Sequence, residues 1–338
     1  MKCQYYKDYR NKKILIAAPL PLPYGGISVH AKRLQRELES NGNQVVVYQA
    51  HLYSNWLERI AFLANVMLHH RPQLLISHTS YHGIFESILF IFLRMILFER
   101  WVLVDHDCRY LDNRSRFFRF IQRYACHWAD NVVLMGNAVK ALYDKHAIYP
   151  KNTIIDCPYI SPAHDELNVK ESLPLLDAFV EKHFPVVLIN GSCFMKTSEG
   201  KDMYGFDTAL ELLHVLKSDY PKIGLIIMVG KNNDQSYLES LKFKCVRLNL
   251  EDNILWLIGN YYLPSIVIKT SLMIRPTISE NFGLSVAEAI DLGVHVVASD
   301  CCKRYPGAFI YPTHEKHNFE QLVRCVLVQR APLNQDAN

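Results

Sequence analysis

Two glutamates near the carboxyl end of the sequence have the types and spacing of a polar binding site. Glu280 lies in a predicted loop and Glu288 in the helix after it, with seven residues between them. The loop runs into the start of that helix through Asn281, Phe282, Gly283 and Leu284. Backbone N–H groups at a helix start bind anions, and carboxylates beside an anion suit the hydroxyls of a sugar or ribose. Ser285 and Glu288 also have the spacing of a capping box, which gives Glu288 a purely structural alternative.

A glycine pair near the amino terminus is a second candidate. Gly25 and Gly26 follow a predicted strand and directly precede a predicted helix. Because glycine has no Cβ, a phosphate can approach this backbone closely, and the helix start favours an anion. The alternative is an ordinary tight turn, and the pair alone is a weak signal.

His106 stands between Asp105 and Asp107 at the carboxyl end of another predicted strand. Ligands of open α/β sheets bind outside the carboxyl ends of the strands, so this position favours a functional role. The sequence holds 15 histidines, and a lone one is more often structural. The same three residues also form an Asp-x-Asp pattern, which is typical of divalent-metal binding.

A basic and aromatic helix is predicted at about residues 115–129. Its arginines and phenylalanines alternate, and no acidic residue occurs before Asp130: Arg114, Arg116, Phe117, Phe118, Arg119, Phe120 and Arg123. Such a helix suits an anionic lipid surface. The alternative is a docked domain helix with one solvated face.

The elements that position these residues alternate between strand and helix. Strands are predicted at 13–19, 44–48, 74–78, 101–105, 131–135, 185–190, 223–229, 254–258, 272–275 and 294–298. Helices are predicted at 28–40, 56–70, 84–98, 115–129, 137–146, 206–218 and 283–292. The alternation weakens in a proline-containing stretch at about 150–180, which places the domain boundary at about 160–183. The sequence therefore predicts an α/β fold with two Rossmann-like domains, 1–165 and 183–338, facing across a cleft.

Composition narrows the classes of protein. The chain has 338 residues and a net charge of only +4, so bulk charge gives no case for nucleic-acid binding. Nine cysteines without a Cys-x-x-Cys spacing, and a polar, basic amino terminus without a signal peptide, favour reduced thiols and a cytoplasmic location. The most apolar stretch, 84–98, carries Glu86 and Arg94, so no transmembrane helix is expected.

The segment from Glu280 to Glu288 resembles the glutamate-x7-glutamate motif of the retaining glycosyltransferases of family 4, which have the GT-B fold. Two further segments resemble the same family. Residues 23–28, Pro-Tyr-Gly-Gly-Ile-Ser, look like its amino-terminal glycine loop, and 129–133, Ala-Asp-Asn-Val-Val, match a stretch that follows a basic helix. The resemblance spans nearly the whole chain.

This resemblance implies a role for each matched residue. Glu280 would lie against the donor sugar, and Glu288 would hydrogen-bond the ribose. The backbone amides from Phe282 to Ser285 would hold the diphosphate and the sugar. Gly25 and Gly26 would let the backbone approach the phosphates, and His106 would contact the donor sugar.

The chain departs from the family where a basic clamp is expected. Family members usually carry an arginine just after a glycine at the end of the first strand of the second domain, and a lysine shortly afterwards. Here Ser192 follows Gly191, and the available cations are Lys196 and Lys201, with Lys201 slightly favoured. Both could instead be solvated loop charges, in which case Arg275 or Lys303 must substitute.

The implied function is transfer of a sugar from a UDP-sugar or GDP-sugar to a glycan or polyprenyl-linked saccharide, with retention of configuration. The resemblance places it in the synthesis of surface polysaccharide, namely O-antigen, capsule or lipopolysaccharide. No cofactor and no metal are expected, since lysines and helix amides would neutralise the diphosphate. A peripheral position on the inner face of the membrane fits a lipid-linked acceptor.

Other functions remain open at this point. They are a metal-dependent transferase of the GT-A fold that uses Asp105 and Asp107, a nucleotide-sugar epimerase or phosphorylase on the same twin-domain fold, and a non-catalytic partner subunit. The first would leave the second β/α series unexplained. The others share the fold, so the fold does not decide between them.

Overall fold

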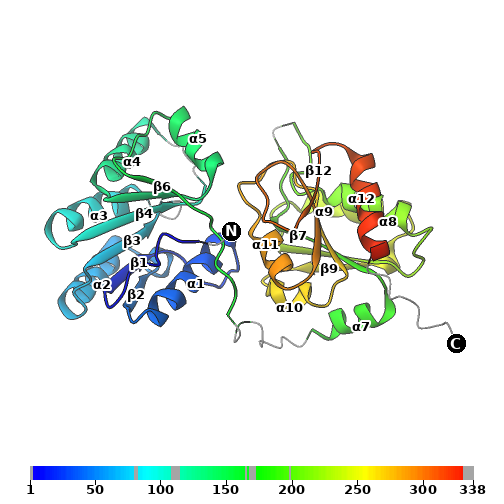
Figure 1. Ribbon diagram of the computed structural model, residues 1–338, viewed down its shortest axis with the longest axis horizontal. Coiled ribbons are helices and arrows are strands. Elements are labelled where there is room, and N and C mark those ends of the chain that lie inside the picture. The colour runs from blue at the N-terminus through cyan, green and yellow to red at the C-terminus, as the bar shows by residue number, and fades with distance from the viewer. Residues whose placement is uncertain are drawn as a thin grey trace. The chain divides into compact units, whose positions relative to one another are not determined.

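The computed structural model describes residues 3–79, 83–107, 115–163, 166, 173–197 and 199–329. The chain divides into two compact units, Met1–Ile160 and Ser161–Asn338. Each unit contains one six-stranded sheet with helices on its faces (Figure 1). The two sheets, each formed by a consecutive β/α series, confirm the predicted α/β class.

The sheet of the first unit has the strand order β2-β1-β3-β4-β5-β6, and every neighbouring pair is parallel. Its strands are β1 (Lys13–Ala17), β2 (Gln44–Tyr48), β3 (Leu74–His78), β4 (Arg100–Asp105), β5 (Asn131–Leu134) and β6 (Thr153–Ile155). Parallel strands place all their carboxyl ends at one edge. The residues that follow β1, β3 and β4 therefore meet at neighbouring positions of that edge.

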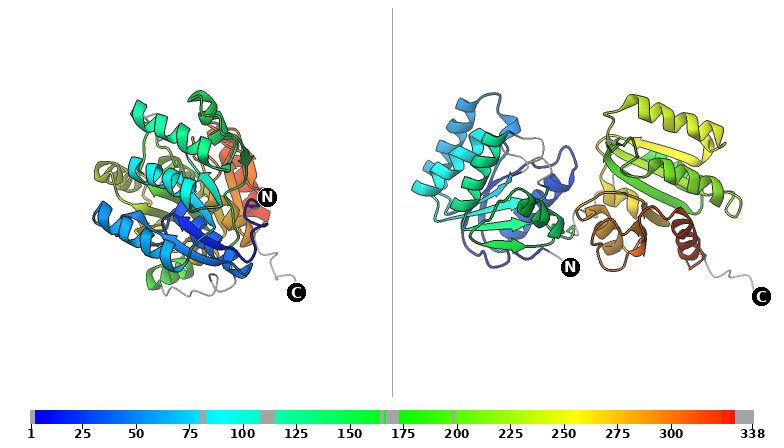
Figure 2. Two further views of the ribbon diagram at one scale, coloured as in Figure 1. Left: turned by 90° about the vertical axis from the view of Figure 1, so that its left-hand side faces the viewer. Right: turned by 90° about the horizontal axis from the view of Figure 1, so that it is seen from above.

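Helices cover both faces of this sheet. They are α1 (Gly26–Ser40), α2 (Trp56–His69), α3 (Ile84–Ile96), α4 (Arg116–Trp128) and α5 (Asn137–Lys145). In β1, Ile14 and Ile16 belong to the core with Leu34 of α1, whereas Leu15 and Ala17 belong to the core on the opposite face. That alternation follows from the two-residue period of a strand. Figure 2 shows α2, α3 and α4 side by side over the second of these faces.

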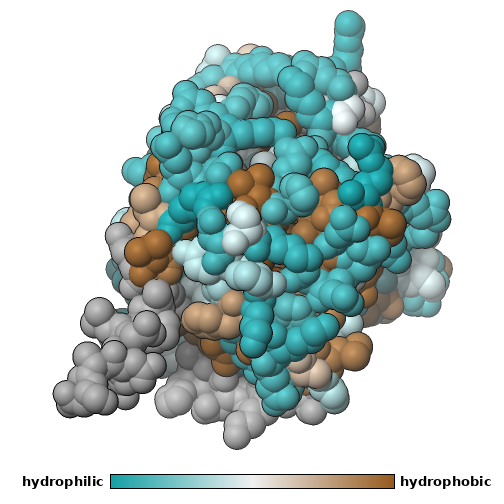
Figure 3. Space-filling model, turned by 90° about the vertical axis from the view of Figure 1, so that its right-hand side faces the viewer, coloured by the Kyte–Doolittle hydropathy of each residue, from teal (hydrophilic) through white to brown (hydrophobic). Residues whose placement is uncertain are grey.

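The sheet of the second unit has the order β12-β11-β10-β7-β8-β9, again with parallel neighbours. Its strands are β7 (Val186–Cys193), β8 (Gly224–Lys231), β9 (Ile254–Ile258), β10 (Leu272–Arg275), β11 (His295–Ser299) and β12 (Phe309–Tyr311). Its helices are α7 (Pro174–Lys182), α8 (Phe206–Leu216), α9 (Gln235–Arg247), α10 (Leu263–Val267), α11 (Leu284–Asp291) and α12 (Lys316–Gln329). Hydrophilic residues dominate the face of this unit seen in Figure 3.

Several elements differ from the sequence analysis. Helices α9 and α12 and the three-residue strands β6 and β12 were not anticipated. Helix α7 occupies part of the stretch that lay between the two predicted domains, and the division of the chain falls before it. The short strands lie at sheet edges, where few apolar residues are needed and the sequence signal is correspondingly weak.

Among the described helices, none combines the length and apolar character needed to cross a bilayer. All cysteines within the described ranges are free.

Two phenylalanines of α3 provide a test of this core assignment. Phe90 is fully buried against Tyr48 and Trp101, whereas Phe92 is 56% exposed. Phe90→Ala should lower the free energy of unfolding by about 3–5 kcal/mol because it leaves a cavity. Phe92→Ala, the matched control on the same helix, should change it by less than about 0.5 kcal/mol. Urea denaturation followed by tryptophan fluorescence measures both, and equal losses would contradict the assignment.

Candidate functional site

An ion-paired cluster lies beyond the carboxyl ends of β10 and β11. Glu280 sits between two arginines, Arg275 at the end of β10 and Arg304 beyond β11. Arg275 donates from Nη2 to Glu280 Oε1, and from Nε to Oε2 at 3.2 Å. Arg304 Nη1 donates to the same Oε2 at 2.5 Å. Both guanidinium groups are almost fully buried, whereas the Glu280 side chain keeps 15% of its surface exposed.

Each arginine is held by further contacts. Arg275 Nη1 donates to the side-chain oxygen of Asn190 at 2.9 Å, and its guanidinium lies 5.0 Å from the centre of the Tyr204 ring. Arg304 donates to the Ser299 carbonyl at 2.8 Å and from Nη2 to Cys301 Sγ at 3.3 Å. These contacts fix both cations before any ligand arrives.

The three ion-paired residues of this cluster, Arg275, Glu280 and Arg304, together carry one positive charge. Burial alone would raise the pKa of Glu280, but the charges and hydrogen bonds of Arg275 and Arg304 outweigh it and lower the pKa to about 2. Glu280 is therefore ionised at neutral pH and is not a general acid. One carboxylate against two guanidinium groups leaves one positive charge among these three residues. The neighbouring Cys301, which accepts from Arg304, adds a negative charge when ionised, and the hydrogen bond from Cys302 lowers its pKa to about 6.

Gly283 joins this cluster to helix α11. Its φ of +78° lies in the left-handed region, and a Cβ there would lie 2.6 Å from Arg304 Nη1 and 2.9 Å from Glu280 Oε2. Glycine is therefore required on both counts. Asn281 is half-buried and Phe282 buried, and Leu284 and Ser285 form the first turn, whose N–H groups lack partners within the helix.

The first residue of α11 tests whether Glu288 belongs to a capping box with Ser285. Helix α11 begins at Leu284, so its N-cap is Gly283 and its third residue is Val286. A capping box would need Ser285 at the N-cap and Glu288 at the third position, so that alternative is wrong. Glu288 is instead the fifth residue of the helix and is buried.

The proposed basic loop presents its two lysines at the surface. Lys201 pairs with Glu199 at 2.8 Å and its side chain is 61% exposed. The ammonium of Lys196 lies 4.2 Å from the centre of the Tyr237 ring.

At the position of the family's arginine, Ser192 Oγ shares a 2.6 Å hydrogen bond with the Tyr204 hydroxyl. Gly191, just before it, is closely packed: a Cβ would lie 2.7 Å from the Phe206 ring. The serine is thus held against the same tyrosine that stacks on Arg275.

The glycine turn in the first unit is shaped by Ser28. Gly25 is the N-cap of α1, Gly26 is its first residue, and Ser28 Oγ accepts from Gly25 N at 3.0 Å and donates to the Pro23 carbonyl at 2.8 Å. Gly25 has an extended backbone with φ −152°, and an added Cβ would meet only Ser28 Oγ at an ordinary 3.8 Å. Within the described ranges, neither the backbone conformation nor a neighbouring atom therefore requires glycine at position 25.

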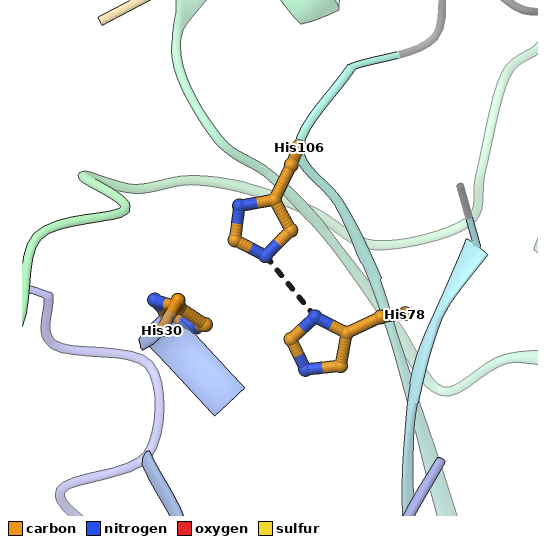
Figure 4. A group of neighbouring side chains, drawn as sticks. All are labelled: His30, His78 and His106. Atoms are coloured by element: carbon orange, nitrogen blue, oxygen red, sulfur yellow. Dashed lines mark hydrogen bonds between the residues drawn. The ribbon is translucent and has the colours of Figure 1, made fainter. Parts of the chain in front are cut away.

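His106 lies in a buried histidine cluster beyond the ends of β3 and β4 (Figure 4). Its Nε2 shares a 3.1 Å hydrogen bond with His78 Nδ1, and its ring packs edge-on against His30 at 4.6 Å between centroids. Burial, followed by the charges of His30 and His78, lowers the pKa of His106 well below its ordinary value. Burial also lowers the pKa of His30, to about 4. Both rings are therefore neutral at pH 7.

The two aspartates beside His106 do not form an outward-facing pair. Asp105 is fully buried and accepts from the Tyr143 hydroxyl at 2.9 Å and from the Asp107 backbone at 3.2 Å. Asp107 is half-buried. Within the described ranges, the grouping of His, Cys, Asp and Glu that could hold a metal is formed by histidines and not by these aspartates.

The basic helix α4 combines a buried side with an exposed one. Phe118 belongs to the core, so of the phenylalanines noted in this helix it does not face solvent. Phe117 is 56% exposed and Arg116 is exposed, whereas Arg119 is half-buried. Arg123 donates to the His146 carbonyl at 2.7 Å. Arg114 lies outside the described residues.

Comparison with known proteins connects these observations. Residues 193–310 match the family model described as glycosyl transferases group 1. The second unit of this chain is therefore similar to glycosyltransferases of group 1 over these residues. The matched segment contains the Glu280 cluster and both loop lysines. No curated protein sequence gives a significant match.

Solved structures share the fold at low identity. Anabaena Alr3699/HepE in complex with UDP and glucose has a TM-score of 0.63 at 16% identity, covering 93% of this chain and 90% of its own. A glycosyltransferase from Rickettsia africae has a TM-score of 0.66 at 13% identity, covering 95% and 89%. WaaG, a glycosyltransferase involved in lipopolysaccharide biosynthesis, has a TM-score of 0.57 at 15% identity, covering 94% and 90%. The fold is GT-B, so the GT-A alternative is wrong.

Sequence reasoning missed three residues of these clusters. Arg304 follows β11 within a Cys-Cys-Lys-Arg run that carries no motif. His78 ends β3 as His106 follows β4, so the strand-end argument applied to both, but it was used only for His106. His30 lies in the first turns of α1 and gave no sequence signal.

Two glycines separate the effect of backbone conformation from that of the charged cluster. Gly283 and Gly293 have nearly the same φ, +78° and +77°, but only Gly283 has neighbours that an added Cβ would strike. Gly293→Ala should cost about 1–2 kcal/mol of unfolding free energy for the left-handed backbone alone. Gly283→Ala should cost clearly more, because Arg304 and Glu280 must also move. Urea denaturation of both variants measures the two losses in unfolding free energy. Equal losses would show that Arg304 and Glu280 move aside without a free-energy cost.

Proposed function

We propose that this chain is a retaining glycosyltransferase of family 4 that moves a sugar from a UDP-sugar or GDP-sugar without a metal ion. The observation that carries this proposal is the placement of Glu280. It lies within the matched group 1 segment, ionised between two buried arginines and next to the start of α11. A sugar diphosphate needs an acceptor of hydroxyl hydrogen bonds and a source of positive charge, and this cluster supplies both.

Glu280 can accept from a donor sugar while it holds the arginines. A carboxylate has about four acceptor sites, and three arginine hydrogen bonds to Glu280 leave capacity for a hydroxyl. Its 15% exposed surface gives that access. Glu288, buried in α11, is proposed to receive the ribose. Glu280 thus positions the sugar and stabilises charge without forming a covalent bond to it.

Positive charge for the leaving diphosphate comes from several sources in this proposal. The guanidinium groups of Arg275 and Arg304 contribute positive charge, and the N–H groups from Phe282 to Ser285 add the partial charge of the start of α11. Lys196 and Lys201 are exposed and can turn toward a ligand. Gly191 and Ser192 border the same loop. No metal is needed for neutralisation in this arrangement.

The reaction is a front-face substitution. The acceptor hydroxyl oxygen bonds to the anomeric carbon on the side from which the diphosphate leaves, while the bond from that carbon to the phosphate oxygen breaks. The hydroxyl proton passes to the departing phosphate oxygen, which gives the glycoside and a nucleoside diphosphate. This needs no protein base, in agreement with the ionised and ion-paired state of Glu280.

The first unit is proposed to supply two further donor contacts. Gly25 and Gly26 let the backbone approach the phosphates, and this role would account for a glycine at position 25 that no described neighbour requires. His106 contacts the donor sugar. Its Nε2 is bonded to His78, so Nδ1 is the ring nitrogen proposed to meet a sugar hydroxyl.

The acceptor is proposed to be a glycan or polyprenyl-linked saccharide in surface-polysaccharide synthesis, reached at the inner face of the membrane. Exposed apolar side chains support a membrane contact. On α3 and just after it they are Ile88, Phe92, Met95, Ile96 and Leu97, on α4 Phe117, Phe120 and Tyr124, and on α2 Trp56, Leu57, Ile60 and Leu68. We name these residues the α2–α4 apolar face. Contiguous exposed apolar surface marks an interaction site, and nearby arginines suit anionic lipid.

These three helices are tied into one surface. Arg59 of α2 pairs with Glu86 of α3. Arg94 of α3 pairs with Asp130, just after α4, at 2.9 Å. The apolar side chains of α3 and α4 recur at spacings of three and four residues, so each set lies on one side of its helix.

The test of sugar transfer begins by identifying the donor. Thermal-shift measurements against UDP-, GDP- and ADP-sugars identify it, because a bound ligand raises stability by mass action. With that donor and a lipid-linked saccharide acceptor, Glu280→Gln should lower kcat/KM by about 10²–10³-fold, the range for loss of one preorganised polar group. Exposed Glu251→Gln is the matched control and should be unchanged.

Four outcomes would contradict parts of this proposal. An inverted anomeric configuration in the product, read by NMR, would exclude retention. Loss of activity in EDTA with recovery in manganese would exclude the metal-independent mechanism. Donor conversion without an acceptor would indicate an epimerase, and a chain that binds no nucleotide sugar would indicate a non-catalytic partner.

Membrane contact is tested by vesicle co-sedimentation. The double variant Phe117→Glu and Phe120→Glu should lose binding to vesicles that contain anionic lipid, because it places charge on the α2–α4 apolar face. Phe243→Glu is the matched control, since Phe243 is 65% exposed on α9 of the other unit. Equal binding by both variants, or no binding by the unaltered chain at low salt, would exclude this surface.

A further inference from the structure

The histidine cluster of the first unit has a geometry that the proposed transfer reaction does not use. His30 comes from the first turns of α1, His78 from the end of β3 and His106 from the residue after β4. One ring nitrogen from each lies within 4.8 Å of the others, and all three residues are buried (Figure 4). Three separate elements thus bring imidazole rings to one point of the sheet edge.

His30 is oriented as a metal ligand is oriented. Its Nδ1 donates to the Pro158 carbonyl at 2.7 Å, which fixes the ring and its tautomer. Its Nε2 is buried and has no hydrogen-bond partner within the described part of the chain. A buried acceptor nitrogen without a partner costs free energy, whereas a ring anchored by a backbone carbonyl and open at the other nitrogen is the usual second-sphere arrangement of a metal site.

We propose that His30, His78 and His106 bind a single transition-metal ion of the zinc class. Zinc–nitrogen bonds of about 2.0–2.1 Å in a tetrahedron place two ligand nitrogens about 3.3 Å apart. The His78 and His106 nitrogens are already 3.1 Å apart. The largest separation within the group, up to 4.8 Å, closes with ring rotations and small side-chain shifts.

The chemistry of the donors selects the class of ion. Neutral imidazole nitrogens favour zinc, copper, nickel and cobalt, whereas magnesium and manganese prefer oxygen ligands. The ion takes the position of the proton that His78 and His106 share. That proton moves to the other nitrogen of its own ring, so both imidazoles stay neutral. Three protein ligands leave the fourth position of the tetrahedron open.

This site goes beyond the proposed function and competes with part of it. The ring nitrogen of His106 that would meet the ion is the one now bonded to His78, so a bound ion fixes the ring proposed to contact the donor sugar. The site differs from the Asp-x-Asp alternative in ligands and in ion. Its test therefore reads metal binding directly and does not depend on transfer activity.

The experiment uses the full chain, stripped of metal by a chelator and kept reduced. Cobalt(II) is titrated in and followed by its visible absorption, and zinc is then titrated against a chromophoric chelator. Two variants, His78→Gln and His30→Gln, each remove a ligand with little change in size. His69→Gln is the matched control, because His69 is an exposed histidine of α2. Circular dichroism in chelator shows whether each variant is folded.

The expected result is one cobalt ion per chain in a tetrahedral spectrum without a thiolate charge-transfer band. Zinc affinity should fall by about 100-fold or more in folded His78→Gln or His30→Gln, because loss of a ligand costs at least as much as loss of a second-sphere partner. Zinc affinity should stay unchanged in His69→Gln. Equal zinc affinity in all folded variants would overturn the proposal. So would a thiolate charge-transfer band, which would assign the ion to cysteine. Should one ligand variant fail to fold, the other gives the answer.

Discussion

Parallel pairing of strands is the constraint on which the rest of this molecule depends. Both sheets are parallel throughout, so every connection must return across a face and every strand must finish at the same edge. Both faces of the first sheet are covered by packed side chains: Ile14 and Ile16 lie in the core on one face, and Leu15 lies in the core on the other. What remains for chemistry is the edge where strands finish. The Glu280 cluster beyond β10 and β11 uses this edge of the second sheet, and the histidine cluster at the ends of β3 and β4 uses the corresponding edge of the first.

The buried polar groups of the two clusters are stabilised in different ways. Around Glu280 the solution is charge pairing, since each guanidinium has lost its water and gains a carboxylate or carbonyl in return. Breaking such a group by removing one member leaves an uncompensated buried charge. Around His106 the solution is neutrality, because burial lowers the pKa of the rings and keeps the positive charge off them. One edge thus carries fixed charge, and the other carries polar groups without charge.

The sequence predicted the alternation of elements well because apolar periodicity is strong in buried parallel strands. The bounds of β2, β3, β9 and β10 agree with those expected, and Glu280 and Gly283 were singled out by their place after a strand and before a helix. Partners across the edge could not be predicted. That Arg304 reaches Glu280 depends on where β11 lies beside β10, and that His30 meets His106 depends on the packing of α1. The exposure of Lys201 and the burial of Arg275 likewise follow from tertiary contacts that leave no local pattern.

Gly25 and Gly283 illustrate how differently one residue type can be constrained. At position 283 the conformation and the surrounding atoms both exclude a side chain, whereas at position 25 the backbone is extended and the nearest atom is at van der Waals distance. A library of this chain selected only for folding would therefore keep glycine at 283 and let position 25 drift. After a few rounds of such selection, position 283 would still be glycine, whereas position 25 would hold several residue types. Retention of Gly25 would then reflect a requirement other than folding, such as contact with a ligand.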